Sequence, residues 1–161
     1  MNKAIFLDRD GVINLDMVHV HLKEEFVFSP GIFDLCIKFR DAGYIILVIT
    51  NQAGIAKGIY TEDQFVKLTE WMKEQFRDRG ISIAKVYHCP HHPDITEACE
   101  CRKPGPGMIL QAVKDFDLNI SDCILIGDKE SDLQAGRNAG IPETNLYFYS
   151  RDIVIRQLKD K

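Results

Sequence analysis

The sequence predicts an α/β fold in which one doubly wound, parallel sheet carries helices on both faces. Short apolar runs without strict polar alternation recur along the chain, and such runs are typical of strands covered on both sides. Segments with helical spacing of apolar residues separate them, as the crossovers between parallel strands require. Together these observations favour a sheet between two layers of helices.

Apolar runs mark the strands in order along the chain. Each run is shorter than a typical helix and is followed by polar or turn-forming residues. The predicted strands are residues 4–7, 44–49, 81–87, 123–126 and 146–149.

Helix start and stop signals support the segments between the strands. Pro30 and Gly43 bound the first of them, as typical punctuation residues. Thr61 and Gln64 form a capping-box pattern that opens the next helix, which ends before Gly80. The predicted helices are residues 31–42, 61–79, 107–116 and 131–139.

Right-handed crossovers between these strands give a Rossmann-like sheet, most simply ordered 3-2-1-4-5. The direction of winding then reverses between the first and fourth strands. Ligands of open α/β sheets bind outside the carboxyl ends of the strands at this switch point. The functional residues are therefore expected at the ends of these strands.

The composition favours a small soluble ligand. The chain has 161 residues, and we expect one domain spanning residues 1–161. A formal charge of -4 without Lys/Arg runs argues against nucleic acid or an anionic membrane as the main partner. The N-terminal apolar run is too short for a signal peptide or a membrane span, so we expect a cytoplasmic location. We also expect a monomer.

Acidic residues follow the first and fourth predicted strands. Asp8 and Asp10 come directly after the first strand, and Asp128 follows the fourth. Carboxylates brought together at a switch point repel one another unless a hard cation neutralises them. The sequence therefore predicts a Mg²⁺ site formed by Asp8, Asp128 and the backbone carbonyl of Asp10.

Hydrogen-bond donors for an anion follow the second strand. Thr50, Asn51 and Gln52 place a hydroxyl and newly turned backbone N–H groups beside the first strand. Lys103, just before Pro104 and the third helix, supplies a positive charge. These groups suit a phosphoryl group held between the metal and the strand ends.

The two acids after the first strand are expected to divide the chemistry. Asp8 is placed to attack phosphorus as the nucleophile. Because side chains alternate along an extended strand, Asp10 is expected to point away from the metal and to reach the leaving oxygen. Asp10 would protonate the leaving alcohol and then take a proton from the water that opens the aspartyl phosphate.

The segment at residues 89–103 has the ligand pattern of a metal-binding loop. The chain has five cysteines, an odd number, which suits a metal site in a reducing compartment better than a disulfide framework. Three thiolates and an imidazole fit tetrahedral Zn²⁺ with no position left for water, so a structural site is expected. His91 is favoured over His92 by its spacing. The predicted ligands are Cys89, His91, Cys99 and Cys101.

Four motifs in one order resemble the haloacid-dehalogenase (HAD) superfamily of phosphatases. They are Asp8-Arg9-Asp10-Gly11, Thr50-Asn51-Gln52, Lys103-Pro104 and Gly127-Asp128 with Asp132 four residues on. In that superfamily the motifs carry the nucleophile and acid/base pair, the phosphate-binding hydroxyl, the lysine and the metal carboxylate. The resemblance implies these roles for Asp8, Asp10, Thr50, Lys103 and Asp128. Asp132 resembles a partner of the metal site or of Lys103.

The cysteine-rich loop narrows the resemblance to the heptose bisphosphate phosphatases and their relatives, the histidinol-phosphate phosphatases. Cys-Pro-His-His-Pro at 89–93 and Cys-x-Cys-Arg-Lys-Pro at 99–104 carry it. It implies loss of the C7 phosphate from a heptose 1,7-bisphosphate, toward nucleotide-activated heptose for lipopolysaccharide or surface-layer glycans, with Arg102 on the distal phosphate. The implied substrate-binding residues are Asp16, His19, Asn51, Gln52, Ala53, Arg102 and Lys129.

Several alternatives remain at this point. Histidinol phosphate is the rival small substrate. No insertion is large enough for a cap domain, so the fold is expected to be capless, and an open site also suits a phosphoprotein phosphatase. A phosphoacceptor signalling domain would place its aspartate on the third strand, which ends here in His88-Cys89. A purely structural zinc module leaves the strand-end motifs unexplained.

Overall fold

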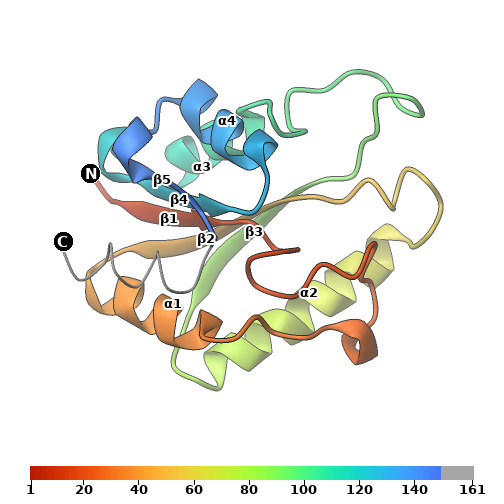
Figure 1. Cartoon of the computed structure of the whole chain (residues 1–161), viewed down its shortest axis with the longest axis horizontal. Coiled ribbons are helices and arrows are strands. Elements are labelled where there is room, and N and C mark those ends of the chain that lie inside the picture. Colours follow the sequence, from red (N-terminus) through yellow and green to blue (C-terminus); the bar gives the residue numbers. More distant parts are fainter. Residues whose placement is uncertain (150–161) are drawn as a thin grey trace.

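The computed structural model describes residues 1–149, and residues 150–161 of the predicted domain lie outside this part. All five strands are parallel and form one sheet in the order β3-β2-β1-β4-β5, which confirms the predicted topology (Figure 1). The strands are β1 (Ala4–Leu7), β2 (Ile45–Asn51), β3 (Ile83–Cys89), β4 (Ile124–Gly127) and β5 (Leu146–Phe148).

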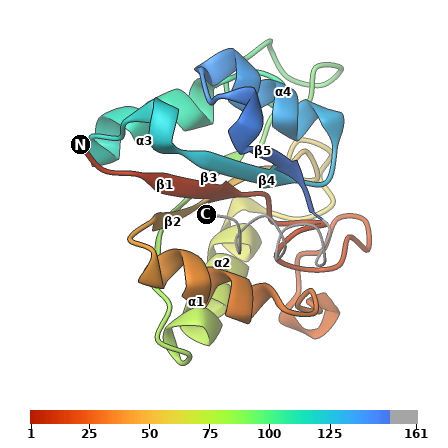
Figure 2. The same ribbon diagram turned by 60° about the vertical axis from the view of Figure 1, so that its left-hand side comes forward.

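Helices cover both faces of the sheet, with α1 and α2 on one side and α3 and α4 on the other (Figures 1 and 2). A buried apolar cluster fills each interface, one containing Leu35 and Phe76, the other Ile109 and Leu133. The helices are α1 (Ile32–Asp41), α2 (Glu62–Arg77), α3 (Gly107–Phe116) and α4 (Glu130–Ala139), with 3-10 turns at Lys23–Glu25, Ile120–Asp122 and Glu143–Asn145.

Local sequence signals set the start of α2 and the end of α4 as expected. The Thr61 hydroxyl accepts a hydrogen bond from the Gln64 N–H, and the Gln64 side chain accepts one from the Thr61 N–H, so the capping box is confirmed. Gly140 ends α4 in the left-handed region at φ +101°.

The third strand differs from its predicted range of 81–87. Ile81 donates its N–H to the Phe76 carbonyl and so belongs to the turn that closes α2. The strand instead runs two residues further, because His88 and Cys89 continue the pairing with Thr50 and Asn51 of β2. The first residue of the zinc loop, Cys89, is thereby placed next to the end of β2.

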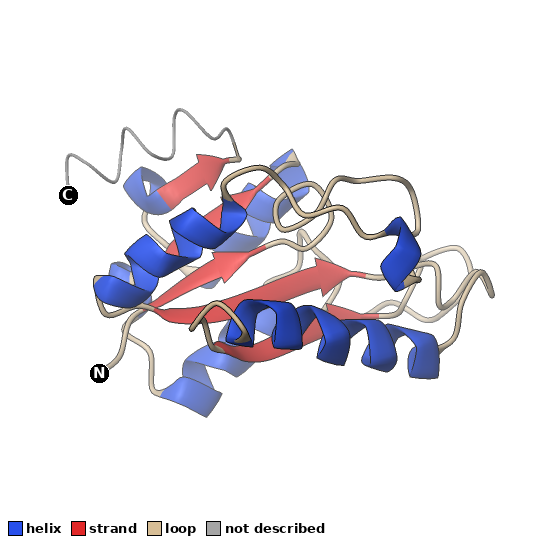
Figure 3. Cartoon of the chain, turned by 90° about the horizontal axis from the view of Figure 1, so that it is seen from below, coloured by secondary structure: helices blue, strands red, loops and turns tan. Residues whose placement is uncertain are grey.

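The loops at the carboxyl ends of the strands lie at one edge of the sheet (Figure 3). Between β1 and α1, and between β2 and α2, the described chain has only loops and the 3-10 turn Lys23–Glu25. In the described residues, therefore, no additional domain covers this edge. Residues 1–149 contain no helix that is long and apolar enough to cross a membrane.

Candidate active site and metal-binding loop

A cavity of about 540 Å³ opens at the carboxyl ends of β1, β2 and β4. Most of the predicted site residues line it. These are Asp8, Asp10, Asp16, His19, Asn51, Gln52, Ala53, Arg102, Lys103, Lys129 and Asp132. Thr50 and Asp128 are close to the strand ends but do not contribute to this lining.

A buried ion-pair network forms the floor of the cavity. Lys103 Nζ lies 3.0 Å from Asp8 Oδ1 and 2.5 Å from Asp132 Oδ1, and it donates to the Ile49 carbonyl at 3.2 Å. Burial opposes the charged ammonium, but Asp8 and Asp132 outweigh this effect and raise the pKa of Lys103. Lys103 is therefore a fixed positive charge beside the Asp8 carboxyl group.

Asp8 itself is only 7% exposed, and this burial raises the pKa of its carboxyl group, while Lys103 lowers it. A nucleophilic carboxylate at this position therefore needs further positive charge. Oδ1 already accepts hydrogen bonds from Lys103 Nζ and from the Arg9 N–H, at 3.0 and 2.9 Å. Oδ2 is the oxygen left for a cation or for phosphorus.

The donor set beside Asp8 fits a hard cation. Carboxylate oxygens of Asp8, Asp128 and Asp132 lie within 4.8 Å of one another. Asp128 Oδ1 is buried and has no hydrogen-bond partner in the described structure. Buried polar atoms are usually paired, so this oxygen is suited to bind a metal ion. A Cβ on Gly11 would lie 2.0 Å from Asp128 Oδ2, so only glycine permits this approach, at φ +91°.

Asp132 binds Lys103 and the turn after β4. A partnership with Lys103 was one of the two roles expected for this residue. Its Oδ1 pairs with Lys103, and its Oδ2 accepts the N–H groups of Asp128 and Lys129, each at 3.1 Å. Although burial alone would raise it, the pKa of Asp132 is lowered, chiefly by Lys103 and also by the Lys129 N–H. Both oxygens of Asp132 are thus engaged by groups other than a metal.

The predicted orientation of Asp10 rested on strand alternation, and that reasoning was wrong. Residues two apart in a strand lie on the same face, and the strand in any case ends at Leu7, with a turn beginning at Arg9. The Asp10 side chain is held instead by hydrogen bonds from Arg9, Asn14 Nδ2 at 2.9 Å, and Gln52 Nε2 at 3.1 Å.

Arg9 is a site residue that the sequence reasoning did not identify. Its side chain is 1% exposed, and its guanidinium lies 5.9 Å from the rings of Phe26 and Phe65. Nη2 donates to both Asp10 oxygens, at 3.1 and 3.2 Å, and to the Val20 carbonyl at 2.8 Å. A charged residue beside Asp10 at the end of a buried strand was the available signal.

The polar residues at the end of β2, two of which the strand includes beyond its predicted range of 44–49, contact protein groups. Asn51 Oδ1 accepts the Lys103 N–H at 3.0 Å, and Asn51 Nδ2 donates to the Lys103 carbonyl at 3.3 Å. Gln52 Nε2 donates to Thr50 Oγ1 at 2.8 Å as well as to Asp10. Thr50 is buried, so its hydroxyl lies beneath the cavity surface.

Positively charged and polar side chains surround the cavity opening. Lys129 Nζ lies 3.9 Å from Asp16 Oδ2, joining the loops after β4 and β1. Arg102 also donates to the His91 carbonyl at 3.3 Å. His92, which was not predicted as a site residue, also lines the cavity. The lining residues that the sequence reasoning missed are Val18, Lys57, Tyr60, His92, Pro104 and Ser131.

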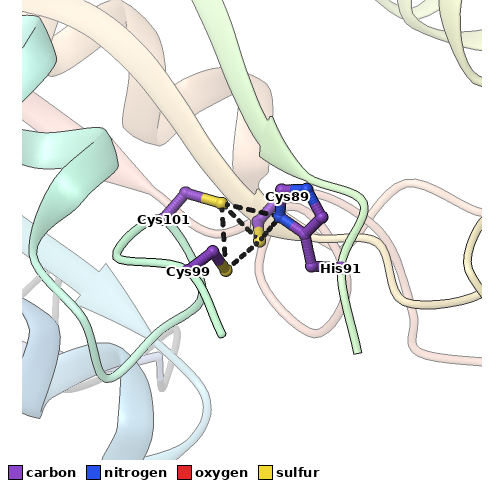
Figure 4. A group of neighbouring side chains, drawn as sticks. All are labelled: Cys89, His91, Cys99 and Cys101. Carbon is purple, nitrogen blue, oxygen red and sulfur yellow. Dashed lines mark hydrogen bonds between the residues drawn. The ribbon is translucent and has the colours of Figure 1, made fainter. Parts of the chain in front are cut away.

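The four predicted zinc ligands converge (Figure 4). His91 Nδ1 lies 3.4 Å from Cys89 Sγ and 3.2 Å from Cys101 Sγ. Cys99 Sγ lies 3.5 and 3.4 Å from the sulfurs of Cys89 and Cys101, which are 2.6 Å apart. Sulfur ligands of tetrahedral zinc are ~3.8 Å apart, so the four atoms need only small shifts to surround one ion.

The described residues therefore combine a buried nucleophile candidate, a fixed lysine and a second acid beside one cavity. This arrangement suits transfer of a phosphoryl group to Asp8, with proton transfer at Asp10.

Comparisons with known proteins identify similar chains. The family model described as HAD-hydrolase-like matches residues 100–144. A D-glycero-alpha-D-manno-heptose-1,7-bisphosphate 7-phosphatase from Campylobacter jejuni is 51% identical over 86% of this chain and 78% of its own length. A D-glycero-beta-D-manno-heptose-1,7-bisphosphate 7-phosphatase from Yersinia pestis is 46% identical over 86% of this chain and 76% of its own length.

A solved structure has the same arrangement of elements. The crystal structure of D,D-heptose 1,7-bisphosphate phosphatase from B. bronchiseptica, complexed with magnesium and phosphate, matches with a TM-score of 0.83. It is 26% identical, and the match covers 100% of both chains.

Proposed function

The chain belongs to the family of D-glycero-D-manno-heptose-1,7-bisphosphate 7-phosphatases, which are HAD-like hydrolases, and we propose that it removes the C7 phosphate of this sugar bisphosphate. The observation that carries the proposal is the Asp8 carboxyl group, held by the buried Lys103 at the cavity floor. The reaction is a phosphomonoester hydrolysis in two steps, through an aspartyl phosphate.

In the first step Asp8 Oδ2 attacks phosphorus. The P–O bond to the sugar breaks, its electron pair goes to the sugar C7 oxygen, and Asp10 donates a proton to that oxygen. Lys103 stabilises the negative charge on the transferring group, because its ammonium is already fixed within 3.0 Å of Asp8.

In the second step water opens the aspartyl phosphate. The Asp10 carboxylate takes a proton from the water as its oxygen bonds to phosphorus. The bond between phosphorus and Asp8 breaks, and its electron pair returns to the Asp8 carboxylate. Asp10 thus serves as acid and then as base, so both steps need its carboxyl group in one position.

Mg²⁺ is the proposed cation, held by Asp8, Asp128 and the backbone carbonyl of Asp10. The unpartnered Asp128 Oδ1 and the relative complexed with magnesium and phosphate support this assignment. The chemistry supplied by the bound ion is charge neutralisation of the carboxylates and of the phosphoryl oxygens.

The rim of the cavity suits a second phosphate that does not react. Lys57, Arg102 and Lys129 line it, and a planar guanidinium favours bidentate phosphate binding. We assign Arg102 to the distal phosphate and Lys103 to the reacting one. The relatives' names include both anomers of the substrate, and the proposal covers both.

Arg102→Ala is expected to raise KM for the heptose bisphosphate much more than for the heptose monophosphate that carries only the C7 phosphate. The lost charged hydrogen bonding corresponds to about 1.5–3 kcal/mol. Steady-state phosphate release on both sugars, with histidinol phosphate as a third substrate, measures the difference. Arg102→Lys is the matched variant. Its KM for the bisphosphate should lie between those of the wild type and Arg102→Ala, because lysine keeps the charge but lacks the planar guanidinium. Equal losses on both sugars would contradict a second phosphate at Arg102.

The second metal in this proposal is structural Zn²⁺, bound by three cysteines and a histidine. The convergence of the four donor atoms supports it. The loop they close also contains Arg102 and Lys103, so the zinc site would hold both residues against the cavity. The ligands are Cys89 Sγ, His91 Nδ1, Cys99 Sγ and Cys101 Sγ.

Cys101→Ser is expected to lose bound zinc and to lower Tm by about 5–15 °C, because a closed four-ligand site contributes to folding. Zinc analysis and thermal melting measure the two effects. Cys123→Ser is the control, since Cys123 lies elsewhere and a serine can keep its hydrogen bond to the Asn119 carbonyl. Wild-type protein prepared without chelators and free of zinc would contradict the assignment.

A further inference from the structure

Tyr60 and Gln52 form a buried hydrogen-bonded pair next to the second acid of the site. We infer that Gln52, oriented by the Tyr60 hydroxyl, is a positioning residue that holds Asp10 for proton transfer to the leaving alcohol. The inference rests on the proposed function, because it takes Asp10 as the general acid. It gives Gln52 a role other than the substrate contact that its sequence position suggested.

All the hydrogen-bonding atoms of the Gln52 amide have protein partners. Its Nε2 donates to Asp10 Oδ2 at 3.1 Å and to Thr50 Oγ1 at 2.8 Å, which uses both amide protons. Its Oε1 accepts the hydroxyl of Tyr60. Gln52 is 2% exposed, so almost none of its surface is available to a substrate.

The backbone on which Gln52 sits is fixed as well. The Gln52 N–H donates to the Cys89 carbonyl at 2.8 Å, which extends the pairing of β2 with β3 by one residue. The amide is therefore carried at the end of a central strand, and rigid elements position functional groups better than loops do.

Tyr60 determines which way the Gln52 amide faces. If the amide were reversed, its Oε1 would lie against Asp10 Oδ2, and two acceptor oxygens would repel. Burial raises the pKa of Tyr60 to about 12, so its hydroxyl keeps its proton and donates to Oε1. Tyr60 is 4% exposed and its ring stacks on His21 at 5.2 Å, which leaves little room for water to replace it.

Close packing of the loop after β2 holds Tyr60 in this place. A Cβ on Gly54 would lie 2.2 Å from the Tyr60 ring, so a side chain at position 54 would displace the ring. The Ile59 N–H donates to the Gly54 carbonyl at 2.9 Å and closes this loop just before Tyr60.

The remaining donors bind mainly the other oxygen of the Asp10 carboxyl group, Oδ1. Arg9 Nε, Arg9 Nη2 and Asn14 Nδ2 donate to Oδ1, whereas Oδ2 accepts Gln52 Nε2 at 3.1 Å and Arg9 Nη2 at 3.2 Å. Without Gln52, Oδ2 keeps only Arg9 Nη2, which is shared with Oδ1 and the Val20 carbonyl, so the carboxyl group gains freedom to rotate. Proton transfer depends on its position, because acid and leaving oxygen must be within hydrogen-bond reach.

The test compares two leaving groups. Loss of an alkoxide from heptose 1,7-bisphosphate needs an acid, whereas p-nitrophenyl phosphate loses a weakly basic phenolate and needs the acid much less. The value of kcat/KM reports only the steps up to and including the first irreversible one, which is departure of the alcohol. It is therefore insensitive to the later attack of water on the aspartyl phosphate. Tyr60→Phe removes one hydroxyl and keeps the ring.

Tyr60→Phe is expected to lower kcat/KM for the sugar bisphosphate by about 5- to 20-fold, the effect of one buried acceptor left unpaired. Gln52→Leu should lower it by roughly 10²-fold, toward the loss of the acid itself. Both should lower kcat/KM for the aryl phosphate much less than for the sugar bisphosphate, so the ratio of the two losses is the readout. Tyr87→Phe is the matched control, because it removes a hydroxyl that donates to Asp115 away from the cavity.

Asp10→Asn separates the inference from the proposed function on which it rests. It should reduce kcat/KM for the sugar by roughly 10²–10⁴ and for the aryl phosphate far less. If it does so while Tyr60→Phe and Gln52→Leu affect both substrates equally, the positioning role is overturned and the acid role stands. If Asp10→Asn itself affects both substrates equally, the acid role is overturned, and the inference with it.

Discussion

Asp8→Asn is expected to lower turnover by roughly 10⁴–10⁶-fold, as loss of a catalytic nucleophile does. An amide cannot form the acyl phosphate that the first step requires. The fold should persist, because the amide oxygen can accept the hydrogen bonds from the Arg9 N–H and Lys103 Nζ. Burial also disfavours the charge that the substitution removes.

Two measurements check this result. Steady-state phosphate release gives the loss of turnover, and acid-quenched protein examined by mass spectrometry shows whether phosphate is attached to the chain. The wild type should carry the phosphate transiently on the peptide that contains Asp8, and the variant should carry none. Asp115→Asn, at the remote end of α3, is the control for a change from acid to amide. Near-normal turnover by folded Asp8→Asn protein would rule out this nucleophile.

Lys103→Met is expected to lower kcat by about 10²–10³, the usual loss when one donor to a developing oxyanion is removed. The reduction should be similar for sugar and aryl phosphates, because Lys103 contacts the transferring group that both share. The variant also leaves Asp8 and Asp132 buried without their counter-charge, which costs about 3–5 kcal/mol of folding free energy. Kinetics on both substrates and urea unfolding measure the two effects.

The control for this lysine is Lys85→Met. Lys85 is half exposed, and its pair with Asp115 is a surface ion pair, which contributes little to stability because solvent screens it. Its loss should therefore leave both kcat and stability nearly unchanged. A Lys103→Met protein that loses activity on only one substrate class would indicate that Lys103 contacts the leaving group.

Strand and helix positions could be predicted because they follow from local patterns. The runs at Ala4–Leu7 and Gly107–Phe116 have the predicted bounds, and the capping box at Thr61 lies where the sequence put it. The sheet order followed from right-handed crossovers, which depend on chain geometry and not on particular side chains. Helix α2 ends at Arg77 and not at the predicted residue 79, because the Ile81 N–H donates a hydrogen bond to the Phe76 carbonyl and closes the helix.

The place of the site could be predicted for a related reason. In a parallel sheet the carboxyl ends of all strands lie at one edge, so Asp8 and Asp128 had to meet wherever β1 and β4 are neighbours. The metal-binding loop was visible because four soft or borderline ligands at short spacing are rare by chance. Neither inference required knowledge of side-chain packing.

Sequence alone thus determined the topology, the edge that carries the chemistry and the residue types gathered there. Only the tertiary structure decided which polar atoms pair. Gln52 and Asp10 lie 42 residues apart in the chain, Asn51 and Lys103 lie 52 apart, and Lys103 and Asp8 lie 95 apart. Local patterns carry no information about such contacts, because an amide or an arginine has several possible partners. Burial excludes water as the alternative, so the choice follows from how the strands and loops pack.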